Sequence, residues 1–270
     1  MATLSILDIG SVIFGSTDNL VRYLQHRQLL ADSLTCGSCA IPMSLGKKAD
    51  ISDGLIFRCG TCKTTKSLRA GSFFSKSKLT LQKWMVLIYW WVRDYPVSDA
   101  AEEAHVDSVW VIQKLIIIIQ GHRGRPPTSP VWVFGMADTS VTPAVGYMQI
   151  VPQRDAATLL PIIQQHVANG STVWSDEWAA YNRVGSLPNV SSHGVVNHSL
   201  EFVNRATGVH TQNIESYWNR VKIKLKRMRG CHEHQLASYL DEFMYRERYG
   251  RTANQLLTNI MLDIAAQYPV

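Results

Sequence analysis

Four cysteines form the strongest chemical pattern in the sequence. They occur as two Cys-x-x-Cys pairs, Cys36 with Cys39 and Cys59 with Cys62, and nineteen residues separate the pairs. Two such pairs can place four thiolates around one Zn²⁺, and the glycine inside each pair is expected to relieve the tight turn. Two unrelated reactive pairs are the alternative. Because cysteine fills all four positions and leaves none open for water, the spacing predicts a structural zinc site.

Basic side chains follow the second cysteine pair directly. Lys63, Lys66 and Arg69 are compatible with nucleic-acid contacts, which zinc ribbons often make, and equally with an ordinary solvated face. The fifth cysteine, Cys231, lies outside both pairs and is interpreted as a lone thiol.

Two carboxylates farther along the chain could do metal chemistry. Asp176 ends a short apolar strand, and Glu215 lies on a helix seven residues before Lys222, which places Glu215 and Lys222 on one helix face. Paired carboxylates can hold Mg²⁺, which prefers oxygen ligands and phosphate-bearing substrates. The alternatives are that Asp176 caps a helix beginning at Glu177 and that Glu215 is simply solvated.

A basic stretch follows Glu215 on the same predicted helix. Its six cations alternate with apolar residues, which predicts a stripe that tracks DNA phosphates; an amphipathic helix with a solvated basic face is the alternative. The six cations are Arg220, Lys222, Lys224, Lys226, Arg227 and Arg229.

Length and composition limit the class of protein. The chain has 270 residues, 46% of them hydrophobic, and a net charge of +6. It can therefore bury a sizeable core, which argues against global disorder, and its basic balance is compatible with a polyanionic partner. Residues 115–119 form the one strongly apolar run, far too short to cross a bilayer. The N-terminus lacks a basic segment before its apolar stretch, so we expect no secretion signal and a reducing compartment.

The elements that must position these residues fall into five segments. Strands are expected at 131–136, 145–151 and 172–174, a helix at 155–167, and helices at 211–229, 233–248 and 252–266. The region at 75–120 contains a buried helix and has a helix-turn-helix outline, which is also common in plain helical packing. The predicted segments are a helical lead-in at 1–30, a zinc ribbon at 31–70, the helical segment at 75–120, an α/β domain at 121–250 and a C-terminal helix at 251–270.

Four short motifs resemble a known family. They are Trp-Val-Phe-Gly at 132–135, Ser-Asp-Glu-Trp-Ala-Ala-Tyr at 175–181, Val-Asn-His-Ser at 196–199 and His-Thr-Gln-Asn-Ile-Glu-Ser-Tyr-Trp at 210–218. Together they look like the transposase domain of ISXO-like bacterial insertion sequences, and still more like the related Merlin DNA transposons of eukaryotes, over about residues 34–250.

The resemblance implies a fold, a reaction and partners. The fold is an α/β, RNase H-like core that cuts and joins DNA with three acidic residues and two divalent ions, Mg²⁺ or Mn²⁺. The partner is double-stranded DNA at transposon ends, with a homodimer as the candidate assembly and no membrane. The location is the nucleus in a eukaryote or the cytoplasm in a bacterium.

The resemblance also assigns individual residues. Asp176 matches the family's second Asp and Glu215 its Glu, while Lys222 matches a trailing lysine that contacts DNA. Asn197 and His198 match a pair that positions the site.

The family's first Asp has no counterpart. It belongs on the first core strand, ahead of a basic loop that is present here at 122–126, yet residues 108–137 contain no Asp or Glu. Either the strand was deleted or residues 115–119 replace it without a ligand. Gln120 is neutral and would hold a divalent ion poorly, and Asp138 comes after the next strand.

The missing first Asp leaves three hypotheses about function. The leading hypothesis is a transposase-derived DNA-binding protein with little or no cleavage activity. The second is an active transposase in which Asp138 or another acid completes the site. The third is a zinc-bearing scaffold without a nucleic-acid role.

Overall fold

A computed structural model of the chain describes residues 6–95, 100, 131–200, 202–228, 230–231, 233–250 and 252–270. The chain forms two compact units, Met1–Val111 with Tyr249–Val270, and Ile112–Arg248. We call them the ribbon unit and the α/β unit. Most of the expected helix-turn-helix outline after its first helix lies outside the described residues, as do the apolar run at 115–119, the basic loop and Arg229.

The ribbon unit combines helices with a small antiparallel sheet. Its strands are hydrogen-bonded in chain order, β1-β2-β3-β4, so each joins its neighbour through a short connection. The elements are α1 (Ile6–Ile13), α2 (Thr17–His26), β1 (Leu34–Thr35), β2 (Pro42–Lys47), β3 (Leu55–Arg58), β4 (Thr65–Ser67), α3 (Leu81–Val92) and α9 (Ala253–Gln267).

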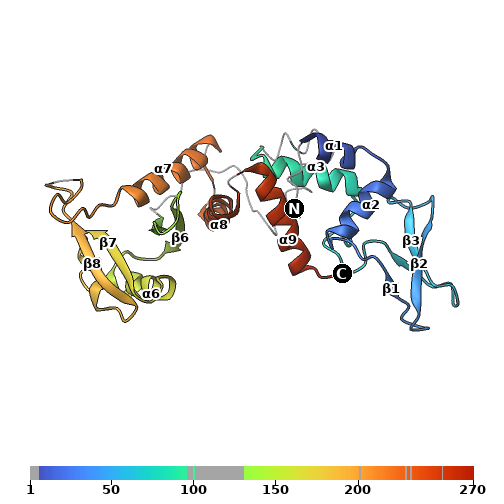
Figure 1. Cartoon of the computed structure of the whole chain (residues 1–270), viewed down its shortest axis with the longest axis horizontal. Helices are drawn as coiled ribbons and strands as arrows, with labels where there is room; N and C mark the ends of the chain where they lie inside the picture. The colour runs from blue at the N-terminus through green and yellow to red at the C-terminus, as the bar shows by residue number, and fades with distance from the viewer. Residues whose placement is uncertain are drawn as a thin grey trace. The chain divides into compact units, whose positions relative to one another are not determined.

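Helix α9, from the far end of the sequence, packs beside α3 in this unit (Figure 1). Phe73 lies edge-on to both Trp84 of α3 and Tyr268, which follows α9, with ring centroids 5.3 and 5.5 Å away. Trp84 itself is fully buried. The C-terminal helix therefore completes the core of the N-terminal unit, although the sequence suggested a separate terminal segment.

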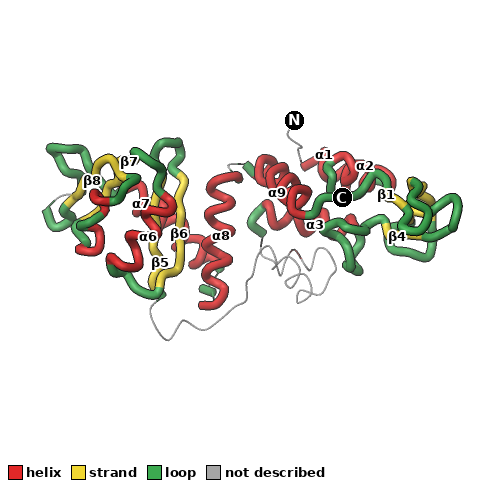
Figure 2. The backbone as a smooth tube through the Cα atoms, turned by 90° about the horizontal axis from the view of Figure 1, so that it is seen from below, coloured by secondary structure: helices red, strands yellow, loops and turns green. Residues whose placement is uncertain are grey.

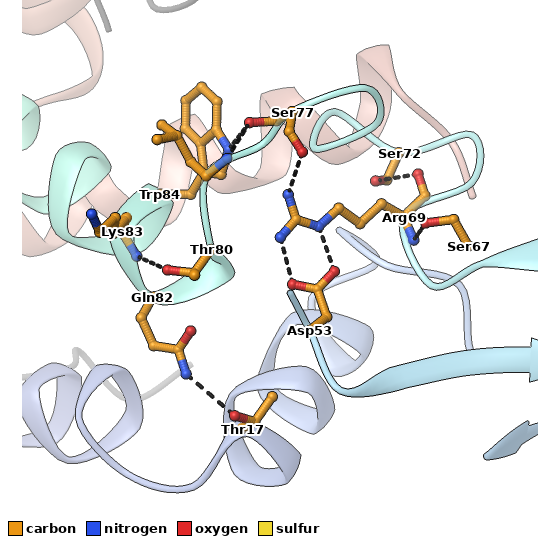
Figure 3. Close-up of polar contacts among 11 residues, drawn as sticks. Thr17, Asp53, Ser67, Arg69, Ser72, Ser77, Thr80, Gln82, Lys83 and Trp84 are labelled. Carbon is orange, nitrogen blue, oxygen red and sulfur yellow. Dashed lines mark hydrogen bonds and ion pairs between the residues drawn. The ribbon is translucent and has the colours of Figure 1, made fainter. Parts of the chain in front are cut away.

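Arg69 is buried in the ribbon unit. Its Nε donates to Asp53 Oδ2 at 2.6 Å, a second guanidinium nitrogen pairs with Asp53 Oδ1, and Nη1 donates to the Ser77 carbonyl oxygen at 3.1 Å (Figure 3). Trp84 Nε1 donates to the Ser77 hydroxyl at 2.9 Å. Both sequence-based interpretations of Arg69, a DNA contact or a solvated face, are therefore wrong: the side chain ties the end of the ribbon sheet to the segment that leads into α3.

The α/β unit contains two pairs of strands. β5 (Trp132–Asp138) and β6 (Val145–Val151) form an antiparallel hairpin, and β7 (Ser171–Asp176) pairs in parallel with β8 (Val190–Val196) (Figure 2). Within the described residues the two pairs form separate sheets. The helical elements are α6 (Ala156–His166), α7 (Gln212–Arg227), α8 (Glu233–Tyr249) and the 3₁₀ turns η1 (Ala179–Tyr181) and η2 (Val184–Ser186).

The hairpin lies between helices because its side chains alternate between two faces. Phe134 belongs to a core with Leu159 and Ile163 of α6, whereas Met148 belongs to a second core with Tyr217 of α7 and residues of α8. Helix α6 therefore covers one face of the hairpin, and α7 with α8 covers the other.

Strand β8 (Val190–Val196) was not predicted from the sequence. Its residues read Val-Ser-Ser-His-Gly-Val-Val, which is too polar in the middle to give a strong strand pattern. Its pairing with β7 brings Asp176 opposite Val196, so the ends of the two strands lie side by side.

Candidate functional site

The four cysteines of the ribbon converge. The sulfur atoms of Cys36, Cys39, Cys59 and Cys62 all lie within 4.8 Å of one another, and the Sγ atoms of Cys36 and Cys62 are 3.5 Å apart. They are the one group of three or more metal-binding side chains found in the part of the chain that the structure describes. Four thiol donors at this separation suit a tetrahedral Zn²⁺ ion.

The two knuckles have matching backbone turns. The N–H of Ala40 donates to the Cys36 carbonyl oxygen at 2.9 Å, and the N–H of Lys63 donates to the Cys59 carbonyl oxygen at 3.2 Å. Ala40 and Lys63 both adopt a left-handed conformation, with φ of 55° and 62°. The expectation that the glycine of each pair carries the turn was wrong, because the strained position is the residue after the second cysteine.

Hydrogen bonds already separate the pKa values of two of the thiols. The hydrogen bonds of Cys62 with the side chain and backbone of Thr64 lower the pKa of Cys62 to about 6. The hydrogen bond of Cys39 to Cys62 raises the pKa of Cys39 to about 12. Cys62 therefore has thiolate character at neutral pH, the form in which cysteine binds a metal.

Asp176 and Asn197 end the two parallel strands in the same way. Asp176 Oδ1 accepts a hydrogen bond from the Trp178 N–H at 3.0 Å, and Asn197 Oδ1 accepts one from the Ser199 N–H at 2.8 Å. Such turns fix a carboxylate or an amide just beyond a strand. Asp176 thus belongs to a strand-end turn, followed by the 3₁₀ turn η1 that begins at Ala179.

Glu215 is linked to the end of β8 through Thr211. The His198 Nε2 and Thr211 Oγ1 atoms are 2.8 Å apart, and the Thr211 hydroxyl donates to Glu215 Oε1 at 2.7 Å. His198 Nε2 also lies 3.6 Å from Glu215 Oε1. Glu215 is in the first turn of α7, where the helix dipole favours a negative charge. No role was predicted for Thr211 from the sequence, although its position just before a helix and four residues ahead of an acid was a usable signal.

Asp138 ends β5. Its Oδ1 accepts a hydrogen bond from the Ser140 N–H at 2.8 Å, and the hydrogen bonds to Ser140 lower the pKa of Asp138 below its usual value. Arg248 contributes to the same lowering as a weaker cause. The carboxyl group is therefore ionised at neutral pH and engaged in its own turn.

The basic residues of α7 have different surroundings. Lys222, Lys226 and Arg227 are exposed, whereas Lys224 Nζ lies 2.9 Å from Oε1 of the buried Glu242 on α8. Arg220 pairs with Glu247 of α8 at 2.8 Å. The stripe read from the sequence is therefore divided into exposed cations and cations paired with α8.

Close packing holds α7 against the hairpin. A Cβ atom added at Gly146 would lie 2.3 Å from Cε1 of Tyr217, and one added at Gly135 would lie 2.7 Å from Cζ2 of Trp218. The Tyr217 hydroxyl donates to the Gly146 carbonyl oxygen at 3.3 Å. The glycines let the helix that carries Glu215 approach the strands directly.

Comparisons with known proteins place the chain among transposases. Residues 99–248 match the family of ISXO2-like transposase domains. An "Uncharacterized transposase-like protein" of Haemophilus influenzae is 30% identical over 112 residues, which make up 41% of this chain and 86% of that protein. No solved structure matches.

The chain belongs to the ISXO2-like transposase family. The resemblance to ISXO-like transposases seen in its motifs is confirmed, and membership connects the chain to DNA transposition and DNA binding. The matched range includes Asp176, Asn197, His198 and Glu215, and the cysteine cluster lies before it. Among the helices that the structure describes, none has the length and apolar character needed to cross a bilayer.

Proposed function

We propose that the protein is a transposase-derived DNA-binding protein whose α/β unit retains most of a catalytic site and has lost DNA cleavage. The observation that carries the proposal is a series of contacts between three elements. Asp176, the last residue of β7, pairs with Val196 of β8, and His198, two residues after β8, reaches Glu215 in the first turn of α7 through Thr211; Asn197 lies between these contacts. Asp176, Asn197, His198 and Glu215 are the residues that the family resemblance assigns to the site.

The proposed core is RNase H-like. Family membership supports it, as does a central hairpin covered by α6 on one face and by α7 and α8 on the other. A homodimer stays a prediction. The expected location is the compartment that holds genomic DNA, which is the nucleus in a eukaryote and the cytoplasm in a bacterium.

The zinc ribbon is proposed as a structural module. Four cysteine ligands leave no coordination position for substrate, so the ion would stabilise the β1–β4 sheet and take no part in DNA cutting.

Asp176 and Glu215 are the residues that would hold Mg²⁺ or Mn²⁺ in the α/β unit. When bound there, divalent ions would supply activation of the attacking oxygen and stabilisation of the leaving oxygen in strand transfer. His198 and Thr211 would orient the Glu215 carboxylate through their hydrogen bonds. The family's first Asp has no counterpart in residues 108–137. Only two carboxylates would therefore face two divalent ions, which leaves much of the positive charge without a ligand. This shortage is our reason to propose loss of cleavage.

The alternative, an active enzyme completed by Asp138, is disfavoured by the course of β5. The guanidinium of Arg154 lies against two tryptophan rings. One belongs to Trp132, the first residue of β5, and the other to Trp178, two residues after Asp176. Asp138 ends the strand six residues farther on, about 20 Å away at the rise of an extended strand. Carboxylates that share metal ions roughly 3.5–4 Å apart must converge within a few ångströms, and the far end of β5 is a poor position for that.

A cleavage assay tests the proposal. The 270-residue protein is incubated with terminal-repeat DNA and Mg²⁺ or Mn²⁺, beside an Asp176→Ala variant. We expect salt-sensitive binding by both proteins and metal-dependent nicking by neither. Nicking by the parent that Asp176→Ala abolishes would show a complete site and support the active alternative. An Asp138→Asn variant would then identify the third ligand.

A further inference from the structure

Two tryptophans from separate motifs meet around one arginine. Trp132 opens β5, Trp178 follows β7, and the guanidinium carbon of Arg154, between β6 and α6, lies 4.3 Å from the Trp132 ring and 4.4 Å from the Trp178 ring. Neither tryptophan side chain has a role in the site described above. Both rings remain partly exposed, at 40% and 43%, so this cluster is part of the surface and not of the core.

The cluster is a built site. Trp178 Nε1 donates to the Arg154 carbonyl oxygen at 3.0 Å, which fixes the second ring against the arginine backbone. Trp132, Arg154 and Trp178 line an open recess together with Gln153 and Asp155. Three segments distant in sequence thus hold one exposed guanidinium against two indole rings.

The charge of Arg154 is available to an external anion. Among the described residues no carboxylate forms an ion pair with it. The neighbouring Asp155 is occupied as the cap of α6, where its Oδ1 accepts from the Thr158 N–H at 2.8 Å. Stacking leaves the edge of a guanidinium, with its fork of N–H donors, free to bind an oxyanion in two-point fashion.

We propose that Arg154, clamped between Trp132 and Trp178, binds a backbone phosphate of DNA beside the Asp176 site. This proposal rests on the proposed DNA-binding function and adds a contact separate from the basic face of α7. The position follows from the turn after β7, in which Trp178 N–H donates to Asp176 Oδ1 at 3.0 Å. A phosphate held at Arg154 therefore lies next to the carboxylate that would bind metal.

A phosphate fits this cluster better than a nucleobase does. The space between the rings is already filled by the guanidinium, so a base could stack there only by displacing it. The planar cation is also pre-oriented, which lowers the entropy lost when it binds phosphate.

The test is DNA binding by fluorescence anisotropy across a range of salt concentrations, with a mixed-sequence duplex as probe. Arg154→Ala is expected to weaken binding roughly tenfold and to reduce the slope of log K against log salt by about 0.9, the value for one phosphate contact. Arg154→Lys should keep the slope and lose affinity severalfold, because lysine keeps the charge without the planar fork. Trp132→Leu should behave like Arg154→Lys.

Arg183→Ala is the matched control. It removes the same charge from an exposed position of the α/β unit, at the start of η2 and outside the recess, and should leave the slope unchanged. If Arg154→Ala and Arg183→Ala reduce the slope of log K against log salt equally, the change comes from net charge alone and the proposal is overturned. An unchanged slope in Arg154→Ala, with binding by the parent intact, would overturn this proposal alone. Absence of salt-dependent binding by the parent would overturn the proposed function as well.

An abasic oligonucleotide separates phosphate from base. Binding of this probe should fall by the same factor in Arg154→Ala, because the probe keeps its phosphates. A defect seen only with base-containing DNA would contradict phosphate binding and favour stacking.

Discussion

The cysteine cluster and the acidic site are assembled over very different lengths of chain. Each cysteine knuckle closes within five residues, through a turn from Ala40 back to Cys36 or from Lys63 back to Cys59. The acidic site instead needs the ends of β7, β8 and α7, which span Asp176 to Glu215. Local turns follow directly from local sequence, whereas a site at element ends depends on how strands and helices pair.

The two regions also differ in completeness. All four donor positions of the ribbon are filled, while the α/β unit presents two of the three acids that its family resemblance implies. The α/β unit can stay folded although its metal site is missing one ligand, because α6 and α7 pack on the hairpin through apolar side chains that need no ion. The ribbon sheet has only four short strands, so we expect its fold to depend more strongly on its ion.

Removing the ribbon metal should have the largest effect. Purified protein is expected to contain about one zinc per chain, because four thiolates bind one ion. Cys39→Ser should lose it and unfold the sheet, since structural zinc contributes on the order of 10–16 kcal/mol to such folds. Metal analysis and far-UV circular dichroism measure both effects.

Cys231→Ser is the matched control, because Cys231 is outside the cluster. It should retain zinc and structure. A folded ribbon without metal would contradict the structural role of zinc.

Breaking the buried ion pair comes next. Asp53→Ala leaves the Arg69 guanidinium buried without its carboxylate, which should cost roughly 3–5 kcal/mol of unfolding free energy. Urea unfolding followed by tryptophan fluorescence measures the change. The exposed Asp50→Ala should change stability by no more than about 0.5 kcal/mol. Equal effects of the two substitutions would show that the pair contributes nothing specific.

Filling a glycine under α7 should perturb the α/β unit alone. In Gly146→Ala the new methyl group overlaps the Tyr217 ring, and overpacking of this kind costs about 1–3 kcal/mol. The ribbon should keep its zinc, which metal analysis checks alongside thermal unfolding. Gly46→Ala in β2 is the control, because its nearest neighbour would be the Ile56 carbonyl oxygen at 4.0 Å. A fully stable Gly146→Ala protein would contradict the close contact.

The smallest effect is expected on the surface of α7. Lys222→Ala and Lys226→Ala should each reduce the slope of log K for DNA against log salt by about 0.9 if each lysine binds one phosphate. Lys224→Ala removes the same charge, but its partner is Glu242, so it should lower thermal stability and leave the slope almost unchanged. Slopes equal to the parent's in Lys222→Ala and Lys226→Ala would show that these two lysines bind no phosphate, and an equal loss in all three variants would show an effect of net charge alone.

The sequence predicted individual elements better than their partners. The hairpin strands, the cap of α6 by Asp155 and the three C-terminal helices follow from apolar periodicity and capping residues, which are local properties. β8 could not be predicted in the same way, because Ser192 and His193 interrupt its apolar pattern and its parallel pairing with β7 supplies the missing stabilisation.

The candidate site shows the same division. The identities of Asp176 and Glu215 were accessible through motif resemblance, but the link of His198 through Thr211 to Glu215 required the folded arrangement. Likewise, helix periodicity places Lys222 and Lys226 on one face, yet only the position of α8 distinguishes them from Lys224.

By itself, the sequence determined the four-cysteine zinc pattern, the hairpin strands with the helices of the α/β unit, and the lack of an acid between residues 108 and 137. Spacing, side-chain type and short-range turn geometry carry all three. Tertiary structure alone decided that α9 returns to pack on α3, that Arg69 is buried against Asp53, and that Trp132 and Trp178 enclose Arg154. The physical reason is that burial and stacking depend on segments far apart in the chain, and the energy of such contacts exists only after those segments have packed together.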